Sequence, residues 1–320
     1  MISRGLPMAD YAAIKALSAG GAWCLVDEAP AKYWVRSPFN SEAAERSNAK
    51  HFDLGIAVHL ALLEPDDLQA RTTVVRGITK TGAPSAGYAS DAAKEQRDAA
   101  YAAGITPLLP EEMATVHAIA QAIEAHPIAR EAFRGGESEV TFTWTDEITG
   151  VPCKCRVDYL PADGSYLADL KSAASANPRE WIKSAARLGY FARAAWYIDG
   201  IGQAMGKAPG DYFFINVEKE LPYLVSVCAF DIKAIEFGRM INRRALQLFE
   251  QCMRTQDWHG YREPGAIRDR AFRVSLPVWA EYALADREQA GEFRPPKITA
   301  ADVKRSARLY APNMDEEALP

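Results

Sequence analysis

Alternating apolar and polar residues mark a group of strands in the middle of the chain. In ESEVTFTWT, residues 137–145, Val140, Phe142 and Trp144 face one way, and the polar residues between them, starting with Glu139, face the other. A period of two is typical of a strand with one buried face. Similar short runs predict four more strands, at residues 151–160, 165–171, 211–219 and 223–231.

Helical patterns lie on both sides of these strands. We expect helices at residues 8–64, about 91–104, about 110–133, 177–206 and about 231–256. Asp53 as N-cap and Pro65 as a stop delimit the apolar piece DLGIAVHLALLEP in the first of them. Asn177 and Pro178 suit the cap and the first position of the fourth. The Gly-, Ser- and Thr-rich stretch 76–92 is predicted to be a loop.

Strands placed between helices, with hairpins in the middle, predict a mixed α/β fold in which helices flank a central mixed sheet. The sequence shows no repeat and no linker between packed halves. We therefore predict one domain over residues 1–285. The charged, Pro-containing segment 286–320 is predicted to be a poorly ordered tail.

Composition narrows the class of protein. Hydrophobic residues make up 48% of the chain, the net charge is −5 and the pI is about 5.7. These values argue against a broadly basic coat of the histone kind, but they leave room for a local basic groove or a metal site. The sequence has neither the apolar run of a signal peptide nor the ~20 apolar residues of a membrane span, so we expect a cytoplasmic protein without a membrane partner.

The five cysteines do not form a disulfide or zinc pattern, because their number is odd and CxxC is absent. Cys153 and Cys155 lie two residues apart on a predicted strand and would face the same side. We interpret them as reduced thiols packed in a core. An iron–sulfur cluster is the alternative, although such a cluster normally needs four thiolates.

The hairpin RVDYLPADGSYLADLKS, residues 156–172, carries the first candidate chemistry. A two-residue turn at Asp163-Gly164 would place Asp158 directly opposite Asp169, and Arg156 opposite Lys171 on the same face. Directly opposed carboxylates repel each other, so they favour a shared proton or a cation between them. Mg²⁺ or Mn²⁺ is a natural occupant because both prefer oxygen ligands. The alternative is a surface hairpin with scattered charges.

Two further features belong with this hairpin. His59 lies in the apolar helix GIAVHLALLEP, where it is either a satisfied core residue or a metal ligand. After the hairpin, Tyr190, Arg193 and Tyr197 form one stripe of a helix. The bases from 171 to 207 are Lys171, Arg179, Lys183, Arg187, Arg193 and Lys207, against the acids Glu180 and Asp199. This segment is a candidate phosphate-facing surface, or else an ordinary solvated helix face.

In this order, the motifs GIAVH, ESEVTFTW, RVDYL, DLK and Y-x-x-R-x-x-x-Y resemble the PD-(D/E)XK nuclease superfamily. More narrowly, they resemble the RecE-type (exodeoxyribonuclease VIII-like) exonucleases of phages and prophages, with the RecB nuclease domain and lambda exonuclease as more distant kin. The resemblance runs from EAPAKYW near the N-terminus to WHGYREPGAIRDRAFRVSLPVWA near the C-terminus. It implies a restriction-endonuclease-like core and metal-dependent hydrolysis of DNA, through digestion of linear duplex ends.

The resemblance also assigns roles. His59 matches the histidine of GxxxH, Asp158 the first motif acid, and Asp169 and Lys171 the acid and lysine of the (D/E)XK motif. Tyr197 matches the tyrosine of a helical QxxxY motif, whose glutamine position holds Arg193 here. An arginine can contact phosphate but cannot accept a hydrogen bond. Glu139 is a second candidate metal ligand, with a solvent-facing role as its alternative.

The residues expected to bind DNA are Arg156, Lys183, Arg187, Tyr190, Arg193 and Tyr197. Mg²⁺ is the expected cofactor, with Mn²⁺ as a substitute. By analogy with relatives, a homo-oligomer and a single-strand annealing protein are expected partners. Two other functions stay open: a nuclease-like module that binds DNA ends without cutting, and a phosphoesterase that acts on something other than long DNA.

Overall fold

The computed structural model describes residues 1–44, 53–77, 87–262, 268, 271–294, 299–301 and 304–305. The chain divides into two compact units, Met1–Tyr261 and Arg262–Pro320. The strands are β1 (Ile2–Ser3), β2 (Leu17–Ser18), β3 (Thr72–Val74), β4 (Thr106–Leu108), β5 (Gly136–Thr145), β6 (Pro152–Pro161), β7 (Tyr166–Ala173), β8 (Asp211–Glu218) and β9 (Val225–Cys228). The helices are α1 (Met8–Ala13), α2 (Ala19–Trp23), α3 (Pro30–Trp34), α4 (Asp53–Leu63), α5 (Leu68–Arg71), α6 (Asp91–Ala102), α7 (Pro110–Ala125), α8 (Pro178–Arg187), α9 (Tyr190–Met205), α10 (Ile232–Thr255) and α11 (Val278–Gln289).

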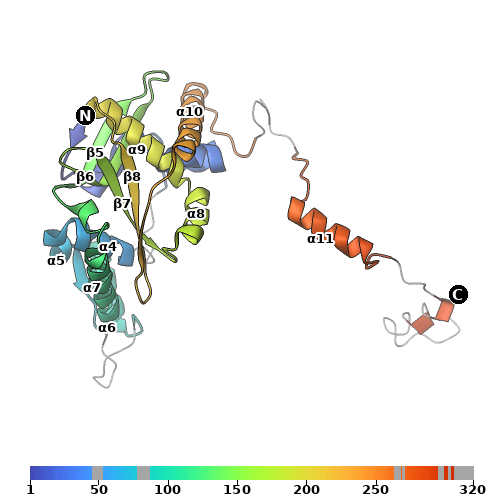
Figure 1. The fold of residues 1–320 in the computed structure, drawn as a ribbon, viewed down its shortest axis with the longest axis horizontal. Coiled ribbons are helices and arrows are strands. Elements are labelled where there is room, and N and C mark those ends of the chain that lie inside the picture. The colour runs from blue at the N-terminus through green and yellow to red at the C-terminus, as the bar shows by residue number, and fades with distance from the viewer. Residues whose placement is uncertain are drawn as a thin grey trace. The chain divides into compact units, whose positions relative to one another are not determined.

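A mixed sheet forms the centre of the first unit, with the order β1-β5-β6-β7-β8-β9 and β2 beside β6. The β5–β6, β6–β7 and β8–β9 pairs are antiparallel, whereas β7 and β8 run parallel. Figure 1 shows helices around this sheet, with α8, α9 and α10 in one group and α4 and α7 in another. The predicted mixed α/β fold is therefore confirmed. None of the described helices is long and apolar enough to cross a membrane.

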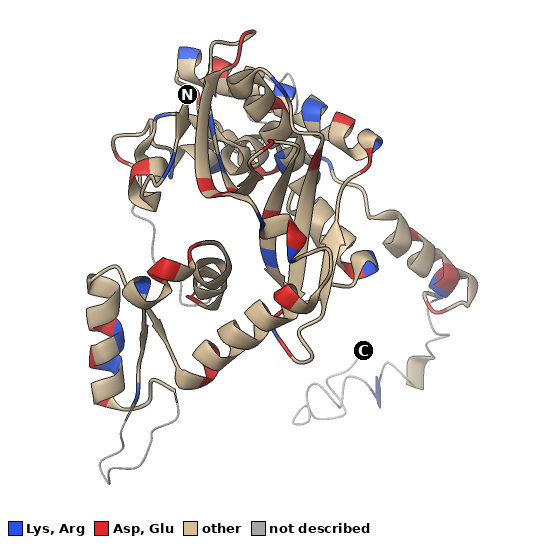
Figure 2. Cartoon of the chain, turned by 60° about the vertical axis from the view of Figure 1, so that its left-hand side comes forward, with Lys and Arg blue, Asp and Glu red and all other residues tan. Residues whose placement is uncertain are grey.

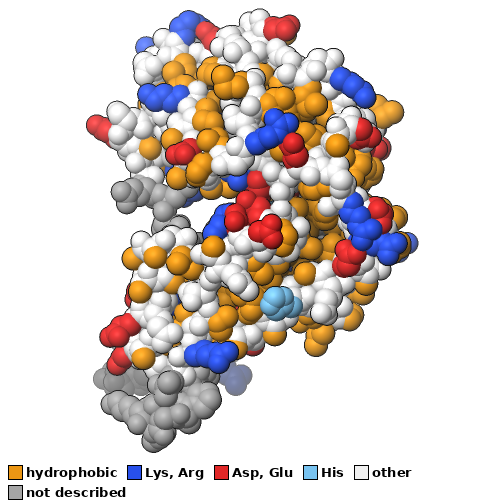
Figure 3. Space-filling model, turned by 90° about the vertical axis from the view of Figure 1, so that its left-hand side faces the viewer, with side chains coloured by type: hydrophobic (Ala, Val, Ile, Leu, Met, Phe, Trp, Pro, Cys, Tyr) orange, Lys and Arg blue, Asp and Glu red, His pale blue; other side chains and the backbone are white. Residues whose placement is uncertain are grey.

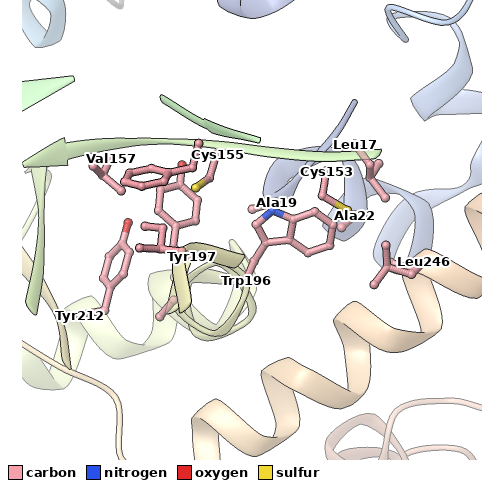
Figure 4. Packing of buried hydrophobic residues seen from close by; sticks show 14 of the residues in the cluster. Leu17, Ala19, Ala22, Cys153, Cys155, Val157, Trp196, Tyr197, Tyr212 and Leu246 are labelled. Carbon is pink, nitrogen blue, oxygen red and sulfur yellow. The ribbon is translucent and has the colours of Figure 1, made fainter. Parts of the chain in front are cut away.

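Two apolar cores cover the two faces of the sheet. One joins the sheet to α2, α9 and α10, and includes Cys153, Cys155, Trp196 and Leu246 (Figure 4). The other joins it to α4 and α7. All five cysteines are free, and Cys153 and Cys155 are fully buried, as predicted for reduced core thiols.

The long helix expected at 177–206 is two helices, α8 and α9. The chain turns at Gly189, whose φ is +67°, a conformation that costs glycine little. A Cβ at this position would lie 2.2 Å from the ring of Trp23. The predicted cap of α8 is confirmed, because the Asn177 side chain accepts a hydrogen bond from the Arg179 amide.

The N-terminal region, expected to be helical over residues 8–64, is divided into several short elements. It contains α1 to α4, the short strand β2 and a π-helical turn at Cys24–Glu28. Residues 45–52 of that prediction and 78–86 of the predicted 76–92 loop lie outside the described residues. The helix predicted at 110–133 ends at Ala125, and a 3-10 turn follows at Glu131–Phe133.

The hairpin keeps the predicted register with a different connection. Tyr159 pairs with Ala168, so partner numbers sum to 327 as expected. Four residues, 162–165, join β6 to β7, and the Gly164 amide donates to the Pro161 carbonyl. Gly164 has a positive φ but Asp163 does not, which excludes the type I′ turn that Asp-Gly favours.

The second unit contains α11. This helix spans the boundary that we predicted after residue 285, and the structure divides the chain earlier, after Tyr261. Much of the predicted tail, including 306–320, lies outside the described residues.

Candidate functional site

The candidate site lies where β6 and β7 separate beyond the Tyr159–Ala168 pair. Asp158 and Asp169 are the next residues toward that opening. The Asp158 carboxylate turns toward the neighbouring strand and accepts a hydrogen bond of 2.8 Å from the Leu170 amide. The backbone of β7 thus fixes one oxygen of Asp158.

Leu170, whose amide binds Asp158, also orients His59 through its carbonyl group. His59 comes from α4, which packs on β7. The Nε2 atom of His59 lies 3.1 Å from the Leu170 carbonyl oxygen. A carbonyl accepts only, so Nε2 carries a hydrogen and Nδ1 of the neutral ring keeps its lone pair. Nδ1 lies 3.8 Å from Asp158 Oδ2. The nitrogen that could bind a metal therefore faces the carboxylate.

Glu139 reaches this point through an unusual backbone. Its φ is +57°, although it lies inside β5. Across the sheet, Val157 belongs to one core and Tyr159 to the other, although residues two apart on a strand normally share a face. The sheet therefore changes face at Glu139 and Asp158. Non-glycine residues with positive φ are costly and cluster at functional sites.

Three side chains at this change of face could hold a metal ion. Among the described residues, His59, Glu139 and Asp158 offer ligand atoms that all lie within 4.8 Å of one another. Two carboxylate oxygens and one imidazole nitrogen form a donor set that suits a divalent cation. The residues present therefore fit a divalent metal centre.

Asp169 has partners from its own strand and from β8. Its carboxylate is buried and forms an ion pair with the Lys171 ammonium. Its Oδ1 accepts a hydrogen bond of 2.8 Å from the Tyr212 hydroxyl. Its Oδ2 faces the Lys171 ammonium, its partner in this ion pair. Asp169 lies outside the three-residue donor set, beside it.

The two aspartates have pKa values that shift in opposite directions. Burial, and then the charge of Asp169, raises the pKa of Asp158. Burial alone would also raise the pKa of Asp169, but the charges of Lys171 and Arg193 hold it below its usual value. Burial and Asp158 raise the pKa of Glu139. Without a cation, a proton is therefore held more readily by Asp158 or Glu139 than by Asp169.

Tyr190, Arg193 and Lys171 form a cationic aromatic group beside Asp169. The Arg193 guanidinium and the Lys171 ammonium lie 5.4 and 5.8 Å from the centre of the Tyr190 ring. Burial alone would lower the pKa of Arg193, but Tyr197 and Asp169 raise it. The arginine in the glutamine position therefore brings a permanent charge close to the motif acid.

Two residues expected at the DNA surface lie inside the protein. Tyr197 is 8% exposed and packs edge-on against Tyr212. It therefore supports the site from within the core, where it is not accessible to DNA. Arg156 forms an ion pair with Glu139 and donates to the Leu6 carbonyl at 2.7 Å. Both side chains are therefore enclosed by the protein, whereas the sequence placed them at the DNA surface.

The remaining predicted DNA contacts lie on or near the surface. Lys183 and Arg187 of α8 are exposed, and Lys183 pairs with Glu180 of the same helix. Figure 2 shows basic and acidic residues close together on the central strands. On the face shown in Figure 3, acidic side chains gather at a hollow with basic side chains beside them.

Sequence reasoning missed Tyr212 and the backbone of Leu170. Tyr212 lies 43 residues after Asp169, on the strand parallel to β7. The run DYFFINVEK contains nothing that separates this tyrosine from its aromatic neighbours. Only the register between β7 and β8, which a sequence pattern does not provide, could have identified it.

The fold and this acid-lysine arrangement define a nuclease-like domain of the PD-(D/E)XK type. The chain belongs to the family described as "PDDEXK-like domain of unknown function (DUF3799)", whose model matches residues 32–267. All of the candidate metal ligands, together with Asp169 and Lys171, lie within that range. No curated protein matches the chain.

A solved structure agrees with this fold. The chain is similar to a "Putative exonuclease" from Eubacterium rectale, with 14% identity and a TM-score of 0.58 over 88% of this chain and 99% of the other. A second structure, SSO0001, gives 12% identity and a TM-score of 0.27, over 67% of this chain and 89% of the other. The first supports the architecture, and the second is too dissimilar to carry an argument.

Proposed function

We propose that the protein is a metal-dependent exodeoxyribonuclease that hydrolyses phosphodiester bonds of linear DNA from its ends. The observation that carries this proposal is the meeting of His59, Glu139 and Asp158 next to an Asp169–Lys171 pair. A solved structure of the same fold, described as a "Putative exonuclease", supports cleavage from chain ends. Mg²⁺ would be the resident ion, with Mn²⁺ as its substitute.

The chain's own residues would divide the work as follows. His59, Glu139 and Asp158 would hold the ion, and Asp169 would present a further carboxylate oxygen to it. The bound ion would supply charge stabilisation at the phosphate and a more acidic water. Lys171 would orient the attacking water or stabilise negative charge that develops on the phosphate oxygens.

The cations around Tyr190 would position the DNA strand. Lys171 and Arg193 place two positive charges next to one aromatic ring, and Tyr190 itself stacks on Phe214 with 5.4 Å between ring centres. Lys183 and Arg187 on α8 would add charge along the backbone of the substrate. A homo-oligomer, a single-strand annealing partner and a role in phage-type recombination in the cytoplasm belong to the proposal by analogy alone.

Single-turnover digestion of end-labelled duplex DNA tests this function, with and without Mg²⁺ and with closed circular duplex as a second substrate. Linear DNA should be digested from its ends, the circle should survive, and EDTA should stop the reaction. Lys171→Ala should lower the rate by about 10²-fold or more, as expected for a group that stabilises transition-state charge. Lys94→Ala is the matched control, because Lys94 pairs with Asp91 on the exposed surface of α6.

Three outcomes would contradict the proposal. Full activity of Lys171→Ala with an intact fold would remove the assigned role. DNA binding that survives EDTA, without cleavage under any divalent ion, would favour a non-cleaving end-binding module. Strong competition by small nucleotides, with little effect of duplex DNA, would favour a phosphoesterase for another substrate.

A further inference from the structure

Tyr212 contacts the motif acid but belongs to no predicted motif. It comes from β8, which runs parallel to β7, and its register partner there is Leu167. Phe214, two residues further along β8, pairs with Asp169. Because residues two apart on a strand share a face, Tyr212 lies on the same face as Asp169 and next to it. Its hydroxyl donates to Asp169 Oδ1 at 2.8 Å.

The ring of Tyr212 is held firmly by its surroundings. The residue is 2% exposed. It packs edge-on against Tyr197, at 5.5 Å between ring centres, and in a tilted arrangement against Phe214, at 4.8 Å. Figure 4 shows Tyr212 and Tyr197 within the core that lies against the sheet. A ring enclosed in this way has few alternative rotamers, so its hydroxyl stays directed at one oxygen of the carboxylate.

The two oxygens of Asp169 are therefore distinguished. Oδ1 accepts the hydrogen bond from Tyr212, whereas Oδ2 pairs with the Lys171 ammonium. Removal of the Tyr212 hydroxyl would leave Oδ1 buried without the donor that holds it. The carboxylate could then rotate toward Lys171 or Arg193. A buried acceptor that loses its donor is costly, which favours such a rotation.

From this geometry we infer that Tyr212 is a positioning residue, which fixes the Asp169 carboxylate so that Oδ2 is presented to Lys171 and to a divalent cation. The inference rests on the proposed function insofar as that function assigns a metal to this site. It adds a residue from a different strand, which acts through Asp169 and touches neither metal nor substrate. Hydrogen-bond partners of metal ligands generally tune affinity in this way.

Mn²⁺ binding to the full-length protein tests the inference without any DNA, through the electron paramagnetic resonance signal of free Mn²⁺. Tyr212→Phe keeps the packed ring and removes only the hydroxyl. We expect the dissociation constant for Mn²⁺ to rise about 10- to 100-fold, the usual effect of removing such a partner. Tyr33→Phe is the matched control, since Tyr33 is another buried tyrosine of the same core and no hydrogen bond joins its hydroxyl to a candidate ligand. It should leave Mn²⁺ binding unchanged.

A double-mutant cycle separates positioning from a general structural effect. In an Asp169→Asn background, Tyr212→Phe should change Mn²⁺ affinity by less than about 3-fold, because the carboxylate through which it acts is gone. An equal loss in both backgrounds, or no loss in the unsubstituted chain, would overturn the inference. So would a failure of the unsubstituted chain to bind Mn²⁺.

This experiment remains distinct from the test of the proposed function. A chain that binds Mn²⁺ and shows the Tyr212–Asp169 coupling, but digests no DNA, would refute the exonuclease and retain the positioning role. A chain that digests DNA but shows no coupling between Tyr212 and Asp169 would support the exonuclease and refute the positioning role.

Discussion

Asp158 combines a stability cost with a functional role. Burial and Asp169 raise its pKa above the usual 3.8, so the folded state holds its proton more tightly than the unfolded state does. Stability is therefore lost as the pH rises through that raised pKa. Asp158→Asn should raise the metal-free Tm at pH 8 by about 2–4 °C, the shift that about 1 kcal/mol produces in a domain of this size. The gain should vanish near pH 4, and thermal unfolding at both pH values measures it.

Asp146 is the control of opposite sign. It is 8% exposed and bonds Arg243 through both oxygens, at 2.8 and 2.9 Å. Burial alone would raise its pKa, but the hydrogen bonds from Arg243 and Thr149 lower it. The Asp146 carboxylate stabilises the fold at pH values above its pKa in the unfolded chain. This stabilisation is lost as the pH falls through the lower pKa that Asp146 has in the folded chain. Asp146→Asn should therefore lower Tm at pH 8, and equal signs for the two variants would contradict this electrostatic assignment.

The left-handed backbone conformation of Glu139 lowers the stability of the fold at a candidate metal ligand. A left-handed conformation costs a side-chain-bearing residue about 1–2 kcal/mol, and glycine avoids most of that cost. Glu139→Gly should therefore be more stable than Glu139→Ala by about 1 kcal/mol, although both lose the same pairing with Arg156. Urea unfolding without metal measures the difference. Equal midpoints, or a more stable alanine variant, would show that the position is not strained.

At this scale the sequence predicted which candidate residues lie near one another better than it predicted their contacts. The period of two and a short connection were enough to place Asp158 beside Asp169, although four residues join the strands in place of the predicted two-residue turn. The pairing of Arg156 with Glu139, and that of Tyr212 with Asp169, depends on neighbouring strands. Such contacts follow from sheet order, which one sequence does not give.

Among the elements, the break between α8 and α9 was the clearest departure from prediction. Capping residues predicted where α8 begins, and the continuing amphipathic pattern concealed where it ends. The chain turns at Gly189, where a φ of +67° costs glycine little, and Trp23 of α2 occupies the space that a side chain there would need. Local conformational freedom and long-range packing therefore both set this boundary.

That packing makes Gly189→Ala a sharp test. Alanine would combine a left-handed backbone with a Cβ 2.2 Å from the Trp23 ring. We expect a loss of about 2–5 kcal/mol, from conformational cost and overpacking together. Gly206→Ala is the matched control at the other end of α9, where φ is +75° and a Cβ would meet no atom within 4 Å. It should cost only about 1–2 kcal/mol, and similar losses for both variants would remove the role assigned to Trp23.

For the whole molecule, the division after Tyr261 predicts where the chain can be shortened. The candidate ligands, Lys171 and both apolar cores belong to Met1–Tyr261. Charged, Pro-containing composition suggested a boundary after residue 285, but composition does not reveal which residues pack. Trp258 does pack: it stacks on Trp34 with 4.4 Å between ring centres. The boundary of the first unit therefore lies beyond this tryptophan.

A chain ending at Tyr261 should consequently keep the Tm and the Mn²⁺ affinity of the full protein, within about 2 °C and 2-fold, because it retains the residues that build the site. A chain ending at Gln256 is the matched control. It loses Trp258 and also His259, whose carbonyl accepts a hydrogen bond from the Ala31 amide. Removing a fully buried tryptophan lowers the free energy of unfolding by about 3–5 kcal/mol. Trp258 is only partly buried, so we expect a smaller loss of stability, which would lower Tm by several degrees. If the chain ending at Tyr261 unfolded as early as the shorter one, the first unit would depend on residues after 261 for its stability.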